Sequence, residues 1–347
     1  MKIIEEDFGN GFHLITLTNQ SGMKLAVSDL GARIVHLQVP VKDGMRELVL
    51  GFDSAEEYQT KDAYIGASIG RVAGRIRDGK FKIGQESYQV EVDPETGHTL
   101  HGGTPGFEEK KWTYTCISGA NETSVIFSMT SPDGEHGFPG NLDVEVRYTL
   151  TNDNVWRIQT RGLSDKDTLF NPTNHVYFNL TGDVTQTVGE HTLWVNAKQY
   201  APLRKDSIPT GELVAVADSA FDFTKPRKLQ EMFDDTSFKQ KQLVDGIDHP
   251  FFLRESGLET SAAKLISPDE LVSVTVETTE PSVVIFTANF GENTPEMHGE
   301  KLANHGGITF ETQEAPGSEQ FESFGNILLS ANEIMETTTE FKIETFA

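Results

Sequence analysis

The dominant pattern along the chain is an alternation of apolar and polar residues with a period of two. The clearest run has apolar residues separated by polar or charged ones, at Leu142, Val144, Val146, Tyr148 and Leu150. Shorter runs show the same alternation at residues 23–27, 88–92 and 272–276. A period of two predicts half-buried strands, with apolar side chains toward a core and polar ones toward solvent.

Turn residues separate these runs. Asp-Gly pairs at residues 78–79 and 133–134 allow the positive φ angles that tight hairpins need. Many short strands joined by tight turns predict an all-β fold, a large antiparallel β-sandwich, with residues 1–347 as a single domain. Loops that leave this scaffold are expected at residues 182–241, a region rich in Pro, Gly and Asp.

Helical patterns are few and short. The sequence Ser-Ala-Glu-Glu at residues 54–57 matches a capping box, which predicts a short helix through Tyr58. A second helix is expected at residues 225–233, with Pro226 in its first turn. Neither pattern changes the all-β prediction.

The most distinctive stretch is Asn-Pro-Thr-Asn-His-Val-Tyr-Phe-Asn-Leu at residues 171–180. It predicts a polar turn at residues 171–174 and a buried strand at residues 176–180, with His175 between them. An imidazole in that position is held rigidly and can face a cleft, and its ordinary pKa suits proton transfer near neutral pH. On this local pattern alone, a structural histidine bonded within the fold is the alternative interpretation.

Net charge limits the partners. The chain has 29 Lys and Arg residues against 53 Asp and Glu residues, which gives a formal charge of −24. A field of that sign repels nucleic-acid phosphates and anionic lipid surfaces, so neither nucleic acid nor a membrane is expected as a partner. A neutral small molecule remains compatible with this charge.

The cysteine content and the N-terminus bear on cofactors and location. The single cysteine, Cys116, excludes an intrachain disulfide and a thiolate metal cluster. Acidic residues lie within residues 1–8, where a signal peptide would carry its apolar segment, and no run of about 18 apolar residues occurs. We expect a cytoplasmic protein that is a monomer or a homodimer.

Two glycine-containing stretches place polar side chains where folding alone does not demand them. Arg75 follows a glycine, and its guanidinium offers a planar fork of donors for sugar hydroxyls or a carboxylate. A surface arginine beside a bulge is the alternative. In His-Thr-Leu-His-Gly-Gly at residues 98–103, the glycines permit a turn that leaves the His101 ring in a cleft. His98 and His101 could form a metal pair, but no third ligand lies at a matching spacing, so no metal site is expected.

Two further candidates lie in the last third of the chain. Asp248 lies two residues before a proline, in a segment where the chain is pushed toward extended geometry, although a simple Asx turn would explain it equally well. Residues 282–291 form a nearly continuous apolar stretch that predicts a strand. Its Phe286 is expected in the core, with stacking on a sugar as a second role.

The most informative strand pattern is at residues 306–313. Alternation places Thr309, Glu311 and Gln313 on one polar face, and Glu311 becomes a candidate general base if that face lines a cleft. The chain lacks a phosphate loop, a dinucleotide fingerprint, a Gly-x-Ser-x-Gly elbow and a His-Glu-x-x-His motif. His, Asp, Glu and Arg side chains on a β scaffold then favour acid/base chemistry without metal or cofactor on a polar, neutral molecule.

Taken together, these motifs resemble those of the aldose 1-epimerases, the galactose mutarotases, over nearly the whole chain. They are Leu-Gly-Ala-Arg-Ile-Val at residues 30–35, Ala-Gly-Arg-Ile at 73–76, Leu-His-Gly-Gly at 100–103, the central stretch at 171–179, Gly-Ile-Asp-His-Pro at 246–250 and Gly-Ile-Thr-Phe-Glu at 307–311. Each motif is short, but their combination in this order is specific. The family fold, a large antiparallel β-sandwich with an open cleft, agrees with the period-two pattern.

The resemblance implies an isomerase that needs no cofactor and interconverts the α and β anomers of D-galactose and D-glucose in hexose metabolism. It implies that His175 is the general acid and Glu311 the general base. It also implies that the sugar is bound by Arg75, His101, Asp248 and, on a looser match, Phe286.

Three other functions would use some of the same residues. A sugar-binding module without catalysis would not need both His175 and Glu311. A glycosidase would use Asp248 and Glu311 as its carboxylate pair and would leave His175 without a role. An epimerase of sugar phosphates would need more Arg or Lys at the cleft, which the net charge of −24 disfavours.

Overall fold

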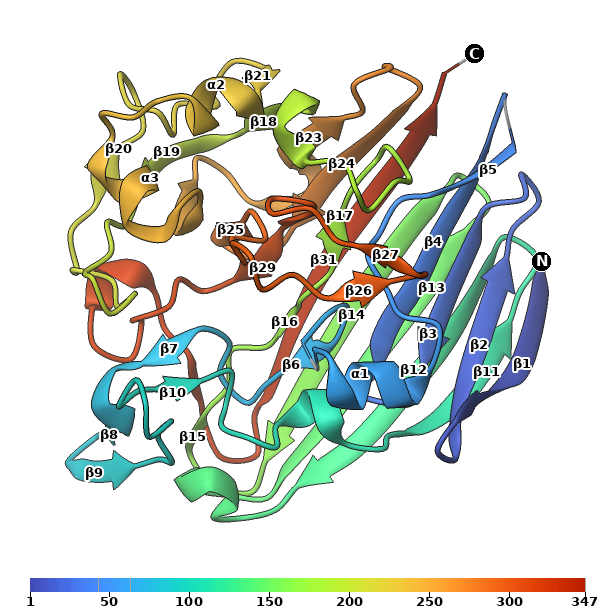
Figure 1. The fold of residues 1–347 in the computed structure, drawn as a ribbon. Helices are drawn as coiled ribbons and strands as arrows, with labels where there is room; N and C mark the ends of the chain where they lie inside the picture. The colour runs from blue at the N-terminus through green and yellow to red at the C-terminus, as the bar shows by residue number, and fades with distance from the viewer. Residues whose placement is uncertain (43, 63, 347) are drawn as a thin grey trace.

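The computed structural model describes residues 1–42, 44–62 and 64–346, and antiparallel sheets form its framework (Figure 1). The largest sheet of these ranges has nine strands that pair antiparallel throughout. Their spatial order is β11 (Thr113–Ser118), β12 (Glu122–Ser131), β13 (Leu142–Thr151), β14 (Val155–Ser164), β31 (Ile334–Thr345), β24 (Val272–Thr278), β23 (Gly257–Ile266), β18 (Thr192–Val195) and β21 (Arg227–Lys228).

Two five-stranded sheets complete the main framework. The first follows chain order, as β1 (Lys2–Gly9), β2 (Phe12–Thr18), β3 (Lys24–Ser28), β4 (Arg33–Val41) and β5 (Gly44–Glu47). The second has the order β20 (Val214–Ala215), β19 (Ala197–Tyr200), β22 (Asp248–Leu253), β25 (Ser282–Phe286) and β29 (Glu311–Gln313).

One apolar core lies between the large sheet and both smaller ones. Its cluster of buried side chains includes Leu25 of β3, Val146 of β13 and Ile285 of β25. The ring of Trp156 on β14 stacks on Phe341 of β31, with ring centroids 4.8 Å apart, near the centre of the large sheet. The predicted all-β sandwich is therefore confirmed. Because one core joins all three sheets, we propose that residues 1–347 form a single domain.

Short two-stranded pairs lie outside the three main sheets, in the segments that connect their strands. They are β6 (Ser68–Ile69) with β16 (Thr173–Asn174), β7 (Arg75–Ile76) with β10 (Thr99–Leu100), β17 (Tyr177–Phe178) with β28 (Ile308–Thr309), β8 (Lys80–Ile83) with β9 (Glu86–Gln89), β15 (Thr168–Leu169) with β30 (Leu328–Leu329), and β26 (Glu296–Met297) with β27 (Glu300–Lys301). The first three pairs contain or flank four of the residues that the sequence selects as functional, Arg75, His101, His175 and Glu311.

Three short α-helices occur in the described residues: α1 (Ala55–Thr60), α2 (Leu229–Phe233) and α3 (Lys239–Val244). The predicted first helix is confirmed, because the Ser54 hydroxyl accepts from the Glu57 backbone N–H at 3.4 Å. The prediction of a helix from residue 225 is wrong in its first half, where β21 pairs with β18 and delays the helix to Leu229. Within residues 1–42, 44–62 and 64–346, none of the helices has the length and apolar character needed to cross a bilayer.

Local patterns mislead in two places where tertiary pairing takes over. Residues 171–174 do not form the expected turn, because Thr173 and Asn174 form β16 against β6. The strand expected at 176–180 is only the two-residue β17. Likewise the strand expected at 306–313 divides at Phe310 into β28 and β29, which join different sheets.

The remaining strand predictions fall on strands, some of them with different limits. The runs at residues 142–150 and 272–276 are β13 and β24, and the run at 23–27 falls on β3. The run at 88–92 ends early, because β9 stops at Gln89. The strand predicted at 282–291 ends at Phe286. The expectation of loops at 182–241 is wrong in part, since β18 and β19 are strands of two sheets.

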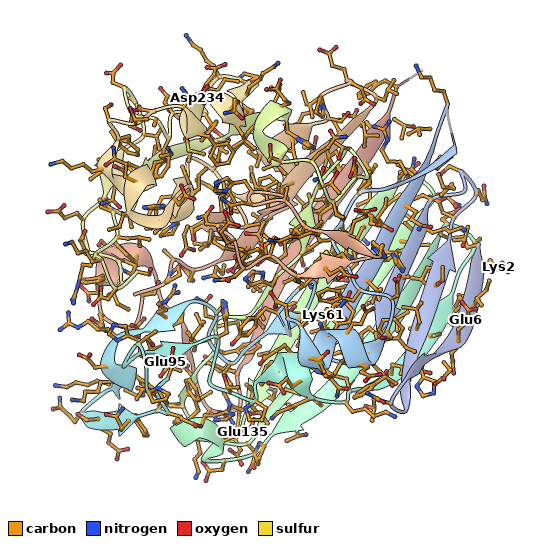
Figure 2. All side chains as sticks on the ribbon, viewed as in Figure 1. Lys2, Glu6, Lys61, Glu95, Glu135 and Asp234 are labelled. Atoms are coloured by element: carbon orange, nitrogen blue, oxygen red, sulfur yellow. The ribbon has the colours of Figure 1, made fainter. Side chains whose placement is uncertain are left out.

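Exposed charged side chains lie on widely separated parts of the surface, among them Lys2, Glu6, Glu95 and Asp234 (Figure 2). The edge strand β1 shows this most clearly, since Lys2, Glu5 and Glu6 are exposed along it. An exposed edge presents unpaired backbone groups to other chains, and charged side chains discourage such pairing. The charged residues on β1 thus discourage pairing at this edge of the sheet.

A buried tyrosine links the large sheet to the central stretch, which allows a test of the framework. The Tyr148 hydroxyl donates to the Ala32 carbonyl at 2.6 Å and accepts from Asn174 Nδ2 at 2.9 Å. In Tyr148→Phe these partners lose a hydrogen bond inside the core, so we expect the free energy of unfolding to fall by about 1–3 kcal/mol. Urea denaturation measures the change. In the matched variant Tyr88→Phe, whose hydroxyl bonds only an exposed Glu86, the midpoint should not move; equal midpoints for both variants would contradict the assignment.

Candidate active site

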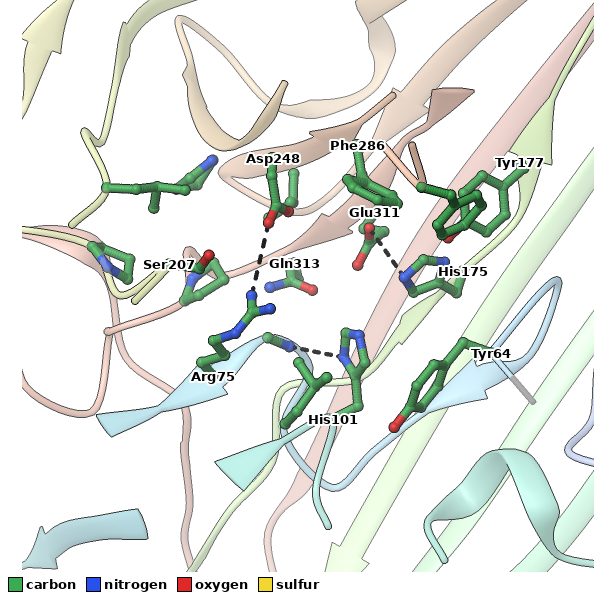
Figure 3. Close-up of a pocket in the computed structure, with 18 of the residues that line it drawn as sticks. Tyr64, Arg75, His101, His175, Tyr177, Ser207, Asp248, Phe286, Glu311 and Gln313 are labelled. Carbon is green, nitrogen blue, oxygen red and sulfur yellow. Dashed lines mark hydrogen bonds and ion pairs between the residues drawn. The ribbon is translucent and has the colours of Figure 1, made fainter. Parts of the chain in front are cut away.

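A cavity of about 190 Å³ opens where the short strand pairs meet the second five-stranded sheet (Figure 3). It brings together every residue that the sequence selects for function: Arg75, His101, His175, Asp248, Phe286 and Glu311. These residues come from six separate stretches of the chain, so the cavity depends on the packing of the whole sandwich. Their roles remain predictions, but their shared location is a property of the fold.

His175 is fixed by its backbone between β16 and β17. Its N–H donates to the Ala67 carbonyl at 2.9 Å, and its own carbonyl accepts from the Gly66 N–H at 2.9 Å. The neighbouring Asn174 adds a bond from its Nδ2 to the Gly66 carbonyl at 3.0 Å. The imidazole is 6% exposed and directs Nε2 toward Glu311, whereas its Nδ1 is buried without a hydrogen-bond partner in the described part of the chain. The ring is therefore positioned by the main chain.

Glu311 is the first residue of β29 and lies opposite Val284 of β25. The Thr309 hydroxyl donates to Glu311 Oε1 at 3.0 Å and accepts from the Phe286 N–H at 3.0 Å, which orients the carboxyl group. The distance from Glu311 Oε1 to His175 Nε2 is 3.6 Å. This is too long for a direct hydrogen bond but short for two ionisable groups, so both can reach the same bound molecule.

Arg75 and Asp248 face each other across the cavity from the His175–Glu311 pair (Figure 3). Arg75 Nη1 lies 3.8 Å from Asp248 Oδ2, and both side chains are about a quarter exposed, at 28% and 23%. Asp248 begins β22, where it pairs with Phe286 of β25. The Arg75 side chain therefore reaches into the cavity, and the alternative of a surface arginine is wrong.

His101 enters the cavity from the turn that follows β10. The turn needs glycine at position 102, because φ is +87° there and a Cβ would lie 2.3 Å from the Gly70 carbonyl oxygen. The Gly74 N–H donates to His101 Nδ1 at 3.1 Å, so the neutral ring carries its hydrogen on Nε2. The expected turn is confirmed, but the ring is buried, at 7% exposure, and not open to solvent.

His98 does not join His101 in a common site. Its Nε2 lies 3.4 Å from Asp206 Oδ2, and its Nδ1 accepts from the Asp78 N–H at 3.1 Å. Both ring nitrogens are therefore engaged outside the cavity. The two histidines do not form the metal pair that their spacing allowed.

Aromatic rings form the remaining wall of the cavity. Tyr177 lies between His175 and Phe286, with ring centroids 5.1 Å and 6.1 Å away. Phe286 and Phe290 are half-buried, and they both line the cavity and pack against a core cluster. Stacking of Phe286 on a sugar remains a prediction. Tyr64 lies over His101 at 4.9 Å. Sequence reasoning missed Tyr64 because it lies in a loop that carries no recognisable motif.

Burial controls the ionisation of the central pair. Burial raises the pKa of Glu311 to about 8, against the opposing effects of the Thr309 hydrogen bond and the Arg75 charge. Burial also lowers the pKa of His175 from its ordinary value of 6.5, although the charge of Asp62 opposes this. Both effects favour uncharged side chains. Near neutral pH, Glu311 and His175 together therefore hold one ionisable proton, counted relative to a carboxylate beside a neutral imidazole.

Asp62 and the other ionisable groups of the cavity respond to burial in the same way. Burial raises the pKa of Asp248 to about 6, even beside Arg75, and raises that of Asp62. Burial and the charges of His175 and Arg75 hold the pKa of His101 well below its usual range, so His101 stays neutral. Asp62 could not be selected from the sequence, because no pattern marks its loop.

The arrangement suits proton transfer to and from one neutral molecule. Glu311 and His175 can contact two oxygen atoms of the same ligand, and the pair holds one proton to give and one vacant position to receive. The opposite side of the cavity offers a guanidinium, a carboxyl group and a ring N–H for hydroxyl groups. The geometry thus fits a polyhydroxylated ligand.

Comparison with known proteins agrees with this chemistry. The family model described as aldose 1-epimerase matches residues 13–342. An aldose 1-epimerase from Haemophilus influenzae is 36% identical over 340 residues, which cover 97% of each chain. A human galactose mutarotase is 35% identical over 322 residues, covering 92% of this chain and 91% of the relative.

Solved structures show the same relationship. The crystal structure of a galactose 1-epimerase from Lactobacillus acidophilus superposes with a TM-score of 0.88 at 30% identity and covers 100% of this chain and 99% of that one. The match therefore extends over the sandwich and the cavity alike. This protein belongs to the aldose 1-epimerase family, whose members are isomerases.

Proposed function

We propose that this enzyme interconverts the α and β anomers of D-galactose and D-glucose by acid/base-catalysed ring opening and closure. The observation that carries the proposal is the 3.6 Å separation of His175 Nε2 and Glu311 Oε1 in one buried cavity. The anomeric hydroxyl and the ring oxygen of a pyranose are bonded to the same carbon. Two proton-transfer groups at this separation can therefore contact both oxygens at once.

Each step balances its protons. Ring opening starts when the single proton of the pair is on His175: Glu311 removes the proton of the anomeric hydroxyl, the bond between C1 and the ring oxygen breaks, and His175 gives its proton to that oxygen. Rotation about the C1–C2 bond of the resulting aldehyde presents the other face of the carbonyl. On closure, His175 takes back the proton of the attacking hydroxyl and Glu311 returns one to the new anomeric oxygen. The pair ends each cycle with the single proton that it began with.

The burial of the pair assists the first half of this cycle. Ring opening converts a carboxylate beside an imidazolium into a carboxylic acid beside a neutral imidazole, and the number of protons on the pair is unchanged. The raised pKa of Glu311 and the lowered pKa of His175 show that the cavity favours the neutral form. Burial therefore stabilises the form that accompanies the open-chain sugar.

The rival functions lose their support. A sugar-binding module and a glycosidase do not agree with membership of an isomerase family. For a sugar phosphate, Arg75 is the only Lys or Arg side chain among the described residues lining the cavity, and it already faces Asp248. The cavity therefore favours an unphosphorylated aldose.

We propose galactose as a substrate because relatives in the family carry the name galactose mutarotase. The enzyme would then supply the required anomer to galactose breakdown. A cytoplasmic location, a monomeric or homodimeric state and independence from cofactors remain predictions of the sequence.

Polarimetry of freshly dissolved α-D-galactose and α-D-glucose tests the proposed pair. The native protein should speed the drift of optical rotation without changing its final value. Glu311→Gln and His175→Ala should each reduce the acceleration by about 10²–10⁴-fold, because each removes one positioned proton transfer. Glu95→Gln, which changes an exposed carboxylate that does not line the cavity, is the matched control and should behave as the native protein does. Full acceleration by Glu311→Gln would sink the assignment of the base.

The dependence of kcat/KM on pH tests the shared proton. Above about pH 8 the pair loses its only proton, so no acid remains and activity should fall. Below the lowered pKa of His175, under 6.5, the pair takes up a second proton, so no base remains and activity should fall again. We therefore expect a bell-shaped profile with its plateau between these limits.

The groups facing the pair modify that profile without reversing it. They are Asp62, Arg75, His101, Tyr177 and Asp248. Asp248, with its pKa near 6, adds to the change on the acid side. A profile with its plateau between 4.5 and 6.5, the ordinary values of a glutamate and a histidine, would show that burial does not control the pair.

A further inference from the structure

The cavity contains a buried amide that the proposed mechanism does not use. Gln313 ends β29, two residues after Glu311, and its side chain lines the same cavity. The residue is 0% exposed, and neither Oε1 nor Nε2 has a hydrogen-bond partner in the described part of the chain. Figure 3 shows the amide between the Arg75–Asp248 side of the cavity and Glu311.

Such an amide is unfavourable unless something binds it. Buried polar groups in folded proteins are almost always hydrogen-bonded, because desolvation without a new partner costs free energy. The main chain around Gln313 is satisfied in the usual way, since its carbonyl accepts from the Ser282 hydroxyl at 2.6 Å. The backbone carbonyl of Gln313 is therefore hydrogen-bonded. Only its side chain, which lines the cavity, lacks partners in the described part of the chain.

The shape of the cavity explains what can reach this amide. Nε2 lies on the side of Gly74, where a Cβ built on that glycine would be 3.8 Å from it and only 2.6 Å from Pro316. Gly74 therefore packs directly against Pro316, and no larger residue fits there. Gly74 and Pro316 line the same cavity as Gln313.

We propose that Gln313 binds the ring hydroxyl groups of the aldose beyond the anomeric carbon, and so helps to determine which sugars the enzyme accepts. This inference rests on the proposed function. An amide offers a donor and an acceptor in one plane, which matches two neighbouring hydroxyl groups, one accepting from Nε2 and one donating to Oε1.

The position along the strand supports this assignment. Residues two apart on a strand point to the same face and lie about 6–7 Å apart. Gln313 is displaced from Glu311 toward Arg75 and Asp248. If Glu311 serves the anomeric hydroxyl, the amide faces the part of the sugar ring that carries the other hydroxyl groups, among which galactose and glucose differ.

The test compares Gln313→Met with the native enzyme on galactose and on its 2-, 3- and 4-deoxy analogues. Methionine keeps the length of the side chain and removes both polar atoms. We expect kcat/KM for galactose to fall by about 10- to 100-fold, since the sugar hydroxyls lose their partners in a buried site. For the analogue that lacks the bound hydroxyl, the native enzyme should already be slow and the variant should lose much less.

Two further measurements separate binding from a structural role. The ligand-free Gln313→Met protein should unfold at the same or a higher urea concentration than the native protein, because the substitution removes an unsatisfied buried amide. Gln320→Met, at an exposed position beyond the same strand, is the control and should match the native enzyme on every sugar. The ratio of kcat/KM values for two sugars does not depend on the folded fraction of the enzyme. If the methionine variant does not fold, the same ratio can be measured with Gln313→Glu.

The outcomes distinguish this inference from the function on which it rests. If the native protein accelerates mutarotation and Gln313→Met loses activity equally on galactose and on every deoxy analogue, Gln313 does not bind these hydroxyl groups. An unchanged kcat/KM in the variant would overturn the inference as well. If the native protein accelerates no sugar, the proposed function itself has failed.

Discussion

The site depends on holding two ionisable side chains 3.6 Å apart in a region where neither can be solvated. No single segment can do this. His175 lies between two-residue strands that pair with β6 and β28, and Glu311 starts β29 at the edge of another sheet. The sandwich beneath them supplies the rigidity, because its core continues from the large sheet through Phe178 and Phe310 to the strands of the cavity. Proximity and burial are therefore two consequences of one packing arrangement.

That arrangement also affects the ionisation of the side chains in the cavity, in a protein whose formal charge is −24. Burial raises the pKa of Asp248 and Glu311 and lowers that of His101 and His175, so each group moves toward its uncharged form. A neutral sugar then meets the hydrogen-bonding groups of the buried pair on one side and the Arg75–Asp248 pair on the other. The account of catalysis needs only that one proton remain on the pair and move between two positions as the ring opens and closes.

Much of the architecture was predictable from the sequence, and the failures have a common physical origin. Long alternating runs such as residues 142–150 predicted their strands well, because strand packing on a core requires a period of two. The two-residue strands around His175 were not predictable, since pairing with distant segments creates them and no local pattern does. The six selected residues do meet in one cavity. Asp62, Tyr64 and the unsatisfied amide of Gln313 gain their meaning only from where the fold places them.

The central claim, a buried pair that shares one proton, is tested most directly by NMR of the ligand-free protein. The carbon signal of the Glu311 carboxyl group, assigned by its loss in Glu311→Gln, would be followed with the nitrogen signals of His175 between pH 4 and pH 9.5. We predict that Glu311 ionises near pH 8 and that His175 takes up its proton only below 6.5. Ionisation of Glu311 near its ordinary value of 4.5, with His175 protonated up to 6.5 or above, would contradict the account.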